Sequence, residues 1–440
     1  PPRSTLFPYT TLFRSLSGTL RVPGDKSISH RSIMLGSLAE GVTRVSGFLE
    51  GEDSLATLRA FRDMGVQIDG PLDGNVTIHG VGMHGLKTPS APLDLGNSGT
   101  SMRLMCGLLA GQGMDVTLVG DASLSRGPMK RVTEPLARMG AKIDSAEGGT
   151  APLQISAVNA LNGLHYDMPV ASAQVKSCLL LAGMYAQGET CVTEPAPTRD
   201  HTERMLQGFG YAVQRQGSQA CLTGGGKLQA CDIDVPADIS SAAFFLVGAS
   251  IAEGSDLLLE HVGMNPTRDG VINILRLMGA DIEVLNARVV GGEPVADLRV
   301  RSAPLKGIRI PQDQVPLAID EFPVLFIAAA CAQGETVLTG AEELRVKESD
   351  RIQVMADGLA VLGVDARPTP DGIVIQGGGR IGGGRVDSHG DHRIAMAFTM
   401  AALRASGDIL IDDCANVNTS FPRFVDLASA AGCRVALQDA

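Results

Sequence analysis

The sequence predicts a two-domain α/β protein built from six copies of one strand–helix–strand–helix–strand unit. Two observations support this prediction. A polar turn, a helix of small residues, a glycine and a β-branched run recur six times in 440 residues. Each copy is followed by an amphipathic helix, a glycine and a further strand. A chain of this length exceeds what one hydrophobic core usually supports, so two domains are expected.

The first copy is VPGDKSISHRSIMLGSLAEGVTRVSG, which starts at Val22. The same pattern returns from Leu95, Met168, Val235 and Val315, and a last copy follows near the C-terminus. One polar residue marks the turn of each copy: Lys26, Asn97, Ser172, Asp238, Asp320 and Asp391. Six similar units of this length predict a repeat architecture in which neighbouring units bury one another's apolar faces.

The two helices of each unit differ in polarity. The first is apolar nearly all round, as in LLLAGM from Leu179, so it is expected to be central and buried. The second carries charges on one face, as in LATLRAFRDMG from Leu55, so it is expected to lie outside. Buried helix N-termini present unpaired N–H groups and partial positive charge, so the six polar turns are the predicted place for a site.

The first of these turns has the composition of an anion-binding loop. Pro23-Gly24 delivers Lys26, two serines and Arg31 at the start of a helix. Backbone N–H groups, hydroxyls and two cations together favour a phosphate or carboxylate. Taken alone, the stretch also fits an ordinary capped helix with two surface cations.

Composition limits the partners and the compartment. The net charge of −11 argues against nucleic acid or an anionic membrane as the main partner, and no apolar run approaches the ~18 residues of a membrane span. The eight cysteines lack CxxC and zinc-site spacing, and most lie in apolar runs. They are predicted to be small buried residues of a reducing compartment, with no metal bound, which indicates a cytoplasmic protein.

Residues 1–15 match nothing in the repeats. They lack the apolar core and cleavage site of a secretory signal, and they carry only Arg3 and Arg14. We interpret them as a foreign or disordered leader that lies outside the fold.

The six units, the PGDKSISHR opening and the run LRVKESDRI from Leu344 together resemble the EPSP synthase family of enolpyruvyl transferases. The resemblance extends from about Leu16 to the C-terminus. It implies an inside-out α/β barrel in each of two domains, with three units per domain and buried helices wrapped by sheets. Domain 1 would be 16–25 plus 238–440, and domain 2 would be 26–237. The chain would cross near Gly24–Lys26 and Pro236–Asp238, and the active site would lie in the interdomain cleft.

The resemblance also implies a reaction. Members of the family transfer the enolpyruvyl group of phosphoenolpyruvate to the 5-hydroxyl of shikimate 3-phosphate by addition and elimination, with release of phosphate. This reaction belongs to the shikimate pathway of chorismate and aromatic amino-acid biosynthesis. No metal or organic cofactor is implied. The chain is expected to act as a monomer, with glyphosate as a candidate inhibitor.

Site residues follow from the positions that match the family's motifs. Asp320 would accept the hydroxyl proton, Glu348 would exchange protons with the methylene carbon, and Lys26 would assist them. The residues expected to bind shikimate 3-phosphate are Lys26, Ser27, Arg31, Ser172, Ala173, Gln174, Arg199, Asp320 and Lys347. Those expected to bind phosphoenolpyruvate are Lys26, Asn97, Gly99, Gln174, Arg351 and Arg393. The dense cationic lining has a physical reason, since two phosphates and two carboxylates must be brought together.

One position departs from the family's pattern. The arginine that usually precedes Pro128-Met129 is replaced by Gly127. Either Arg126 or Lys130 substitutes for it, or the binding of phosphoenolpyruvate and of glyphosate is weakened. By contrast, Gly99 is the residue found in glyphosate-sensitive members, so that position by itself predicts sensitivity.

Two other functions fit parts of the same sequence pattern. The sequence pattern also resembles a sister transferase that acts on UDP-N-acetylglucosamine. That enzyme has Lys-Asn where this chain has Lys26-Ser27, and it uses a cysteine in a loop, whereas Cys106 falls in a predicted helix. A non-catalytic repeat scaffold would not need cations and carboxylates at the ends of the buried helices.

Overall fold

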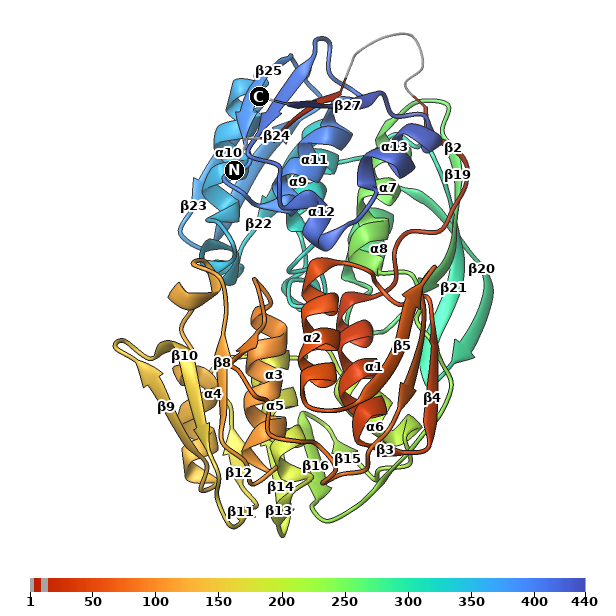
Figure 1. Cartoon of the computed structure of the whole chain (residues 1–440). Coiled ribbons are helices and arrows are strands. Elements are labelled where there is room, and N and C mark those ends of the chain that lie inside the picture. Colours follow the sequence, from red (N-terminus) through yellow and green to blue (C-terminus); the bar gives the residue numbers. More distant parts are fainter. Residues whose placement is uncertain (1–3, 9–14, 440) are drawn as a thin grey trace. The chain divides into compact units, whose positions relative to one another are not determined.

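The computed structural model describes residues 4–8 and 15–439, and within it the chain divides into two compact units (Figure 1). Unit 1 contains the described residues up to Pro23, Pro236–Val289 and those from Pro294 onward. Unit 2 contains Gly24–Val235 and the hairpin tip Val290–Glu293. Within residues 4–8 and 15–439, no helix is both long and apolar enough to cross a membrane.

Three apolar helices form the inside of unit 2. They are α1 (Lys26–Leu38), α3 (Gly99–Ala110) and α5 (Ala173–Gly183), and nearly all residues after the first turn of each are buried. The more polar helices α2 (Glu52–Asp63), α4 (Lys130–Arg138) and α6 (His201–Gly208) each bury one face against them. Because α1, α3 and α5 are apolar all round, they can pack only where other elements surround them.

Three four-stranded sheets enclose these helices, in the orders β18-β4-β6-β5, β7-β8-β10-β9 and β12-β14-β16-β15. The first two strands of each sheet are parallel and the other neighbours are antiparallel. The strands are β4 (Val42–Ser46), β5 (Gln67–Leu72), β6 (Asn75–His79), β7 (Leu93–Asp94), β8 (Val116–Val119), β9 (Lys142–Ala146), β10 (Thr150–Ser156), β12 (His165–Asp167), β14 (Glu189–Thr193), β15 (Gln214–Gln216), β16 (Gln219–Thr223) and β18 (Ile233–Asp234). Short pairs join β3 (Ala39–Glu40) to β17 (Leu228–Gln229) and β11 (Leu161–Asn162) to β13 (Ala186–Gln187).

Unit 1 repeats the arrangement. Its inner helices are α7 (Ile239–Ile251), α9 (Phe322–Cys331) and α11 (His392–Ala401), and every residue of α7 is buried. The outer helices are α8 (Gly270–Leu277), α10 (Arg351–Val361), α12 (Val417–Ser420) and α13 (Phe424–Ala431). One-turn helices occur at η1 (Leu124–Arg126) in unit 2 and at η2 (Gln312–Gln314) and η3 (Glu342–Val346) in unit 1.

The sheets of unit 1 have the orders β2-β19-β21-β20, β22-β24-β23 and β25-β26-β1-β27. The strands are β1 (Ser4–Pro8), β2 (Ser17–Leu20), β19 (Asp256–Gly263), β20 (Asp281–Val290), β21 (Glu293–Arg301), β22 (Gly334–Leu338), β23 (Asp365–Thr369), β24 (Gly372–Gly377), β25 (Gly384–Asp387), β26 (Ile409–Asp412) and β27 (Val435–Asp439). Strand β2 pairs with β19 from the C-terminal half. The predicted α/β class, with buried inner helices wrapped by sheets, is confirmed.

The exclusion of residues 1–15 from the fold is wrong for Ser4–Pro8. This segment forms strand β1, which pairs with β27 along its whole length and with β26 at Leu6. The physical reason is local: the stretch STLFP contains residues that favour strands, and it satisfies backbone groups that β26 and β27 would otherwise leave unpaired. The foreign origin of the leader stays a prediction, and residues 1–3 and 9–14 lie outside the described residues.

The interpretation of all eight cysteines as small buried residues of a reducing compartment fails for one pair. Cys191 and Cys221 form a disulfide, with Cα atoms 4.1 Å apart. They lie directly opposite each other on the antiparallel strands β14 and β16, a register that cysteine spacing in the sequence does not reveal. The other six cysteines are not disulfide-bonded.

Candidate active site

In unit 2, the starts of the three inner helices carry most of the predicted binding residues. Asp25 caps α1 and accepts a hydrogen bond from the N–H of Ile28 at 2.9 Å. Ser98 caps α3 and Ser172 caps α5 in the same way. These caps fix where each helix begins, so the side chains of the first turns are held on rigid elements.

Arg31 links α1 to α5 and α6. It is buried, and each of its three guanidinium nitrogens donates to the protein: Nε to Thr202 Oγ1 at 2.7 Å, Nη1 to the Ser27 carbonyl at 2.9 Å, and Nη2 to Ser177 Oγ at 2.8 Å. Burial lowers the pKa of Arg31 to about 10, so it is still charged at neutral pH. The nearby cation Arg199 contributes to this lowering. Arg31 therefore holds α1 against α5 and α6, and two of its five N–H groups take no part in these three bonds.

Lys26 is the accessible cation at the start of α1. Its Nζ lies 3.1 Å from Asp53 Oδ2 on α2, and about 30% of its side chain is exposed. Asp53 thus holds the amine in one place while leaving part of it open to a ligand. Ser27 follows directly in the first turn of the same helix.

A second network joins α3 to α5. Gln174 accepts from Arg103 Nη1 at 2.9 Å and donates to Thr100 Oγ1 at 3.1 Å. Arg103 Nη1 also donates to the Gly99 carbonyl at 3.3 Å, and a Cβ atom at Gly99 would lie only 2.7 Å from this nitrogen. Asn97, before the helix, donates to Asp121 Oδ2 at 2.7 Å. Arg103, which is absent from the predicted ligands, is therefore the cation that organises this part of the site.

Arg103 also lies close to Gly127, the residue that departs from the family's pattern. A Cβ atom at Gly127 would lie 3.8 Å from Arg103 Nη2, so this guanidinium is beside the position of the missing arginine. Lys130, one of the two predicted substitutes, lies with its side chain against Gly149.

We call the residues around these helix starts the helix-cap cluster; its members are Lys26, Ser27, Arg31, Asn97, Gly99, Arg103, Ser172, Ala173, Gln174 and Arg199.

In unit 1, Asp320 lies among three cations. Its Oδ1 is 3.5 Å from Lys347 Nζ and 3.5 Å from Arg351 Nη1. Its backbone carbonyl accepts a hydrogen bond from Arg393 Nη1 at 3.0 Å. Lys347 is also paired with Glu343 at 2.5 Å. We call Asp320, Lys347, Glu348, Arg351 and Arg393 the carboxylate cluster.

Arg351 is the centre of the carboxylate cluster. It is fully buried and donates to both carboxylate oxygens of Asp391, at 2.8 and 3.3 Å, and to Glu348 Oε2 at 2.6 Å. Burial by itself would lower its pKa, but Glu348 and Asp391 outweigh this and hold the pKa above its ordinary value. Since Arg351 lies within reach of both Asp320 and Glu348, one fixed positive charge controls two candidate proton-transfer groups.

Glu348 is ionised in this arrangement. About half of its side chain is exposed. Desolvation would raise its pKa, but Arg351 and His392 together hold the pKa of Glu348 well below its ordinary value. A group in this state is ready to accept a proton, and it becomes a proton donor only if its cationic partner is neutralised by an anion.

Two supporting residues were not predicted as parts of the site. Asp391 caps α11, accepts from the N–H of Arg393 at 3.0 Å and binds Arg351. Glu321, next to Asp320, is buried, accepts a hydrogen bond from Ser240, and lies 3.7 Å from Arg393 Nη1. The sequence pattern identifies Asp391 as the turn residue of the sixth unit, and its place directly before a helix indicates that its side chain can cap that helix.

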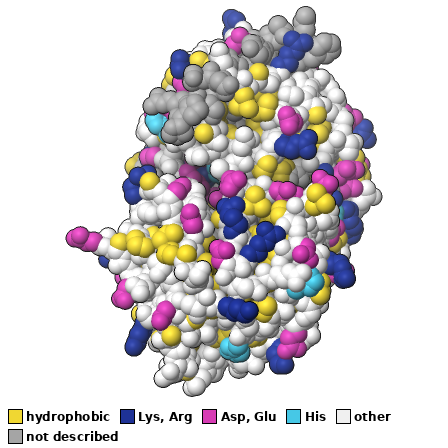
Figure 2. Space-filling model, viewed as in Figure 1, with side chains coloured by type: hydrophobic (Ala, Val, Ile, Leu, Met, Phe, Trp, Pro, Cys, Tyr) yellow, Lys and Arg dark blue, Asp and Glu magenta, His cyan; other side chains and the backbone are white. Residues whose placement is uncertain are grey.

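Charge on the surface is mixed. Figure 2 shows acidic and basic side chains interspersed over the face drawn, among hydrophobic and uncharged atoms. The concentrations of cations relevant to anion binding are therefore the local ones at the helix starts. Among the described residues, the group of His, Cys and Glu donors close enough to share a metal ion lies on strands β12 and β14, outside both clusters.

Comparisons with known proteins agree on one family. A family model for EPSP synthase (3-phosphoshikimate 1-carboxyvinyltransferase) matches residues 11–427. A 3-phosphoshikimate 1-carboxyvinyltransferase of Alkalilimnicola ehrlichii is 73% identical, over 97% of this chain and 96% of that protein. One of Methylococcus capsulatus is 72% identical, over 95% of each. A solved structure of EPSP synthase from Acinetobacter baumannii has 60% identity and a TM-score of 0.92, and covers 99% of this chain and all of that one.

Proposed function

The chain belongs to the EPSP synthase family, and on that premise we propose that it transfers the enolpyruvyl group of phosphoenolpyruvate to the 5-hydroxyl of shikimate 3-phosphate, with release of phosphate. The structural observation that best supports this proposal is the position of Arg351 between Asp320 and Glu348, with Lys347 and Arg393 close by. Such a cluster offers two proton-transfer groups and several anion ligands in one place.

In the addition step, the 5-hydroxyl oxygen attacks C2 of phosphoenolpyruvate. Asp320 accepts the hydroxyl proton, and Glu348 delivers a proton to the methylene carbon C3. Glu348 must be protonated at this stage, although Arg351 holds its pKa low in the unliganded protein. The carboxylate of phosphoenolpyruvate would pair with Arg351 and Arg393, weaken the hold of Arg351 on Glu348, and raise the pKa of Glu348 toward the range in which it donates.

In the elimination step, the bond between C2 and the phosphate oxygen breaks. Glu348 takes a proton back from C3, and Asp320 gives its proton to the leaving phosphate. Each proton has a named donor and acceptor, so the scheme requires neither a metal nor an organic cofactor. Asp320 and Glu348 alternate between acid and base, as a two-step reaction of this kind demands.

The helix-cap cluster is proposed to hold the substrate anions. Lys26 would neutralise charge on both substrates, while Ser27, Arg31, Ser172, Ala173 and Arg199 bind shikimate 3-phosphate. Asn97, Gly99 and Gln174 would bind phosphoenolpyruvate, and Gln174 would also contact shikimate 3-phosphate. Lys347 and Asp320 would complete the shikimate 3-phosphate contacts from the carboxylate cluster. Both clusters would then serve one pair of substrates.

Arg103 is proposed as the cation that compensates for Gly127, because its guanidinium lies beside that position. Glyphosate would compete with phosphoenolpyruvate for the same contacts. We further propose a monomer in the cytoplasm. Size-exclusion chromatography with light scattering checks the first of these, and fractionation of cells that express the untagged chain checks the second.

Phosphate release tests the proposed reaction. Purified protein is mixed with phosphoenolpyruvate and, separately, with shikimate 3-phosphate, UDP-N-acetylglucosamine or no acceptor. Release only in the presence of shikimate 3-phosphate is the expected result. No release with that acceptor, or faster release with the nucleotide sugar, would reject the proposal in favour of the alternatives.

A further inference from the structure

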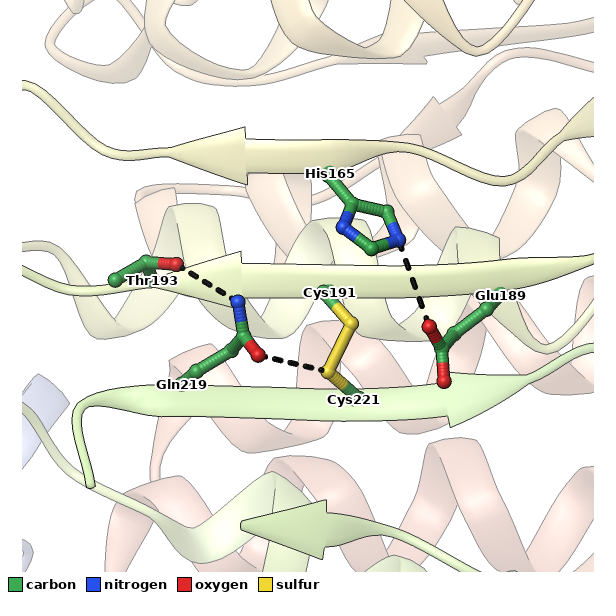
Figure 3. The surroundings of a disulfide bond; sticks show 6 residues. All are labelled: His165, Glu189, Cys191, Thr193, Gln219 and Cys221. Carbon is green, nitrogen blue, oxygen red and sulfur yellow. Dashed lines mark hydrogen bonds and ion pairs between the residues drawn. A yellow bond between two sulfur atoms is a disulfide. The ribbon is translucent and has the colours of Figure 1, made fainter. Parts of the chain in front are cut away.

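Four side chains with metal-binding atoms share one face of the sheet β12-β14-β16-β15 in unit 2. The strand register places His165 opposite Cys191 and Cys191 opposite Cys221. Glu189 lies two residues before Cys191 on the same strand, so it projects from the same face. Val192, with the opposite orientation, packs in the core of unit 2. Figure 3 shows these side chains around the disulfide, with the His165 ring facing the Glu189 carboxylate.

The distances suit a shared ion. His165 Nε2 is 3.5 Å from Glu189 Oε2. One donor atom from each of His165, Glu189 and Cys191 lies within 4.8 Å of the others. Tetrahedral zinc with bonds of about 2.0–2.3 Å separates its ligand atoms by roughly 3.3–3.8 Å, so small side-chain rotations would close the site. His165 is 67% and Glu189 50% exposed, so an ion can reach them from solvent.

The disulfide keeps this set of ligands incomplete. A sulfur bonded to another sulfur is a poor ligand for zinc, whereas a thiolate is a strong one. Reduction would release a second sulfur at Cys221 next to the one at Cys191, because the two residues are register partners. The reduced set would then be one imidazole, one carboxylate and two thiolates, which is within the ligand range of zinc.

We propose that His165, Glu189, Cys191 and Cys221 form a zinc site that is open to the metal only when the Cys191–Cys221 disulfide is reduced. A dithiol reductant supplies two electrons and two protons: the S–S bond breaks, two thiols form, and the reductant becomes a disulfide. Zinc then displaces the two thiol protons, which pass to solvent. Reoxidation by a disulfide oxidant reverses the sequence: the two thiolates give two electrons to the oxidant, which takes up two protons and becomes a dithiol, while the ion is released and the Cys191–Cys221 bond forms again.

Three of the other cysteines are poor candidates for zinc ligands. Burial raises the pKa of Cys106, Cys331 and Cys433 to about 12, so these thiols resist forming the thiolate that binds zinc. Elsewhere in unit 2, His79 lies 3.1 Å from Asp69 and is likewise exposed. That pair is not part of a group of three potential ligands among the described residues, and it provides a matched control.

The test measures binding of zinc alone to the full chain, by competition with a chromophoric chelator. The protein is prepared in air-oxidised form and after treatment with a dithiol that is then removed. Thiol counting after denaturation should give six thiols in the first preparation and eight in the second. The reduced protein should bind one zinc at least tenfold more tightly than the oxidised protein. Equal affinity, or eight thiols in the oxidised preparation, would overturn the proposal.

Variants identify the ligands. Cys221→Ser and His165→Ala should each weaken zinc binding by the reduced protein at least tenfold, whereas Cys231→Ser and His79→Ala should leave it within twofold. Cobalt in place of zinc should give thiolate-to-metal absorption that Cys221→Ser diminishes. Far-UV circular dichroism and phosphate release verify folding, and Glu189→Gln provides a milder variant if His165→Ala fails that check. Wild-type affinity in folded Cys221→Ser and His165→Ala would refute the assignment.

Discussion

Replacing Gly99 by alanine would push a methyl group into the guanidinium of Arg103. The added Cβ would lie 2.7 Å from Arg103 Nη1, whereas ordinary van der Waals contact begins at 3.4 Å. Arg103 Nη1 donates to Gln174 Oε1 at 2.9 Å. If the guanidinium moves by the missing ~0.7 Å, this hydrogen bond is stretched toward or beyond the range in which it contributes.

The expected cost follows from that one bond. A hydrogen bond to a charged group contributes about 1.5–3 kcal/mol, which corresponds to roughly 10- to 150-fold in affinity. The arginine side chain is flexible and can recover part of this loss, so we expect the low end. Gly99→Ala should therefore raise KM for phosphoenolpyruvate about tenfold, with a smaller effect on kcat, because Gln174 is proposed to bind the substrate in its ground state.

A double-mutant cycle distinguishes this route from a direct clash with the ligand. Phosphate release is measured at varied phosphoenolpyruvate in wild type, Gly99→Ala, Arg103→Ala and the double variant. If the methyl group acts through Arg103, its cost should fall below threefold once Arg103 is gone. Gly208→Ala is the control, since its nearest neighbour would be 3.8 Å away. A full tenfold cost in the Arg103→Ala background would refute the reasoning.

Three further predictions concern affinity, pH and the disulfide. Gly127→Arg should leave KM for phosphoenolpyruvate within twofold in the phosphate-release assay, because Arg103 is proposed to supply the missing charge already. A tenfold fall in KM, equivalent to a gain of ~1.5 kcal/mol, would show that Gly127 is an uncompensated deficit. Burial lowers the pKa of His30 from 6.5 to about 3, so His30 takes up its proton at a higher pH in the unfolded protein than in the folded one. The free energy of unfolding therefore falls as the pH drops from 6.5 toward 3. Between pH 7 and pH 5, the free energy of unfolding measured in urea should therefore fall by about 2 kcal/mol less in His30→Asn than in wild type. An equal fall in both proteins would contradict this prediction. The Cys191–Cys221 disulfide joins residues that are 30 positions apart in the sequence. Its reduction, with a chelator present, should lower the free energy of unfolding in urea by about 3.5 kcal/mol, and a decrease below 1 kcal/mol would contradict that value.

The helices of the fold could be predicted because their sequences leave few choices. Helix α7, with thirteen buried residues, is apolar on every side and can lie only inside a core. Strand pairing could not be predicted in the same way. Alternation identifies a strand but not its neighbour, so neither the place of Ser4–Pro8 between β26 and β27 nor the facing of Cys191 and Cys221 was visible.

In the candidate site, too, some residues could be predicted from the sequence and others could not. The residues of the carboxylate cluster were predicted from motifs, and the structure brings them within a few ångströms of one another. The supporting residues were missed because they are distant in sequence from the residues that they bind: Asp391 lies 40 residues from Arg351, and Arg103 lies 71 residues from Gln174. Contacts of this kind depend on how the six units pack, which a single repeat does not encode.

The central claim is that the two clusters, which lie on separate compact units, serve one reaction. The most direct measurement is phosphate release from phosphoenolpyruvate that depends on shikimate 3-phosphate, in wild type, Lys26→Met and Asp320→Asn, with thermal unfolding as the check on folding. We predict that both variants fold and that each loses at least 100-fold in rate, since one removes a charge needed for the anions and the other removes the base. A folded variant of either kind that kept the wild-type rate would contradict the account.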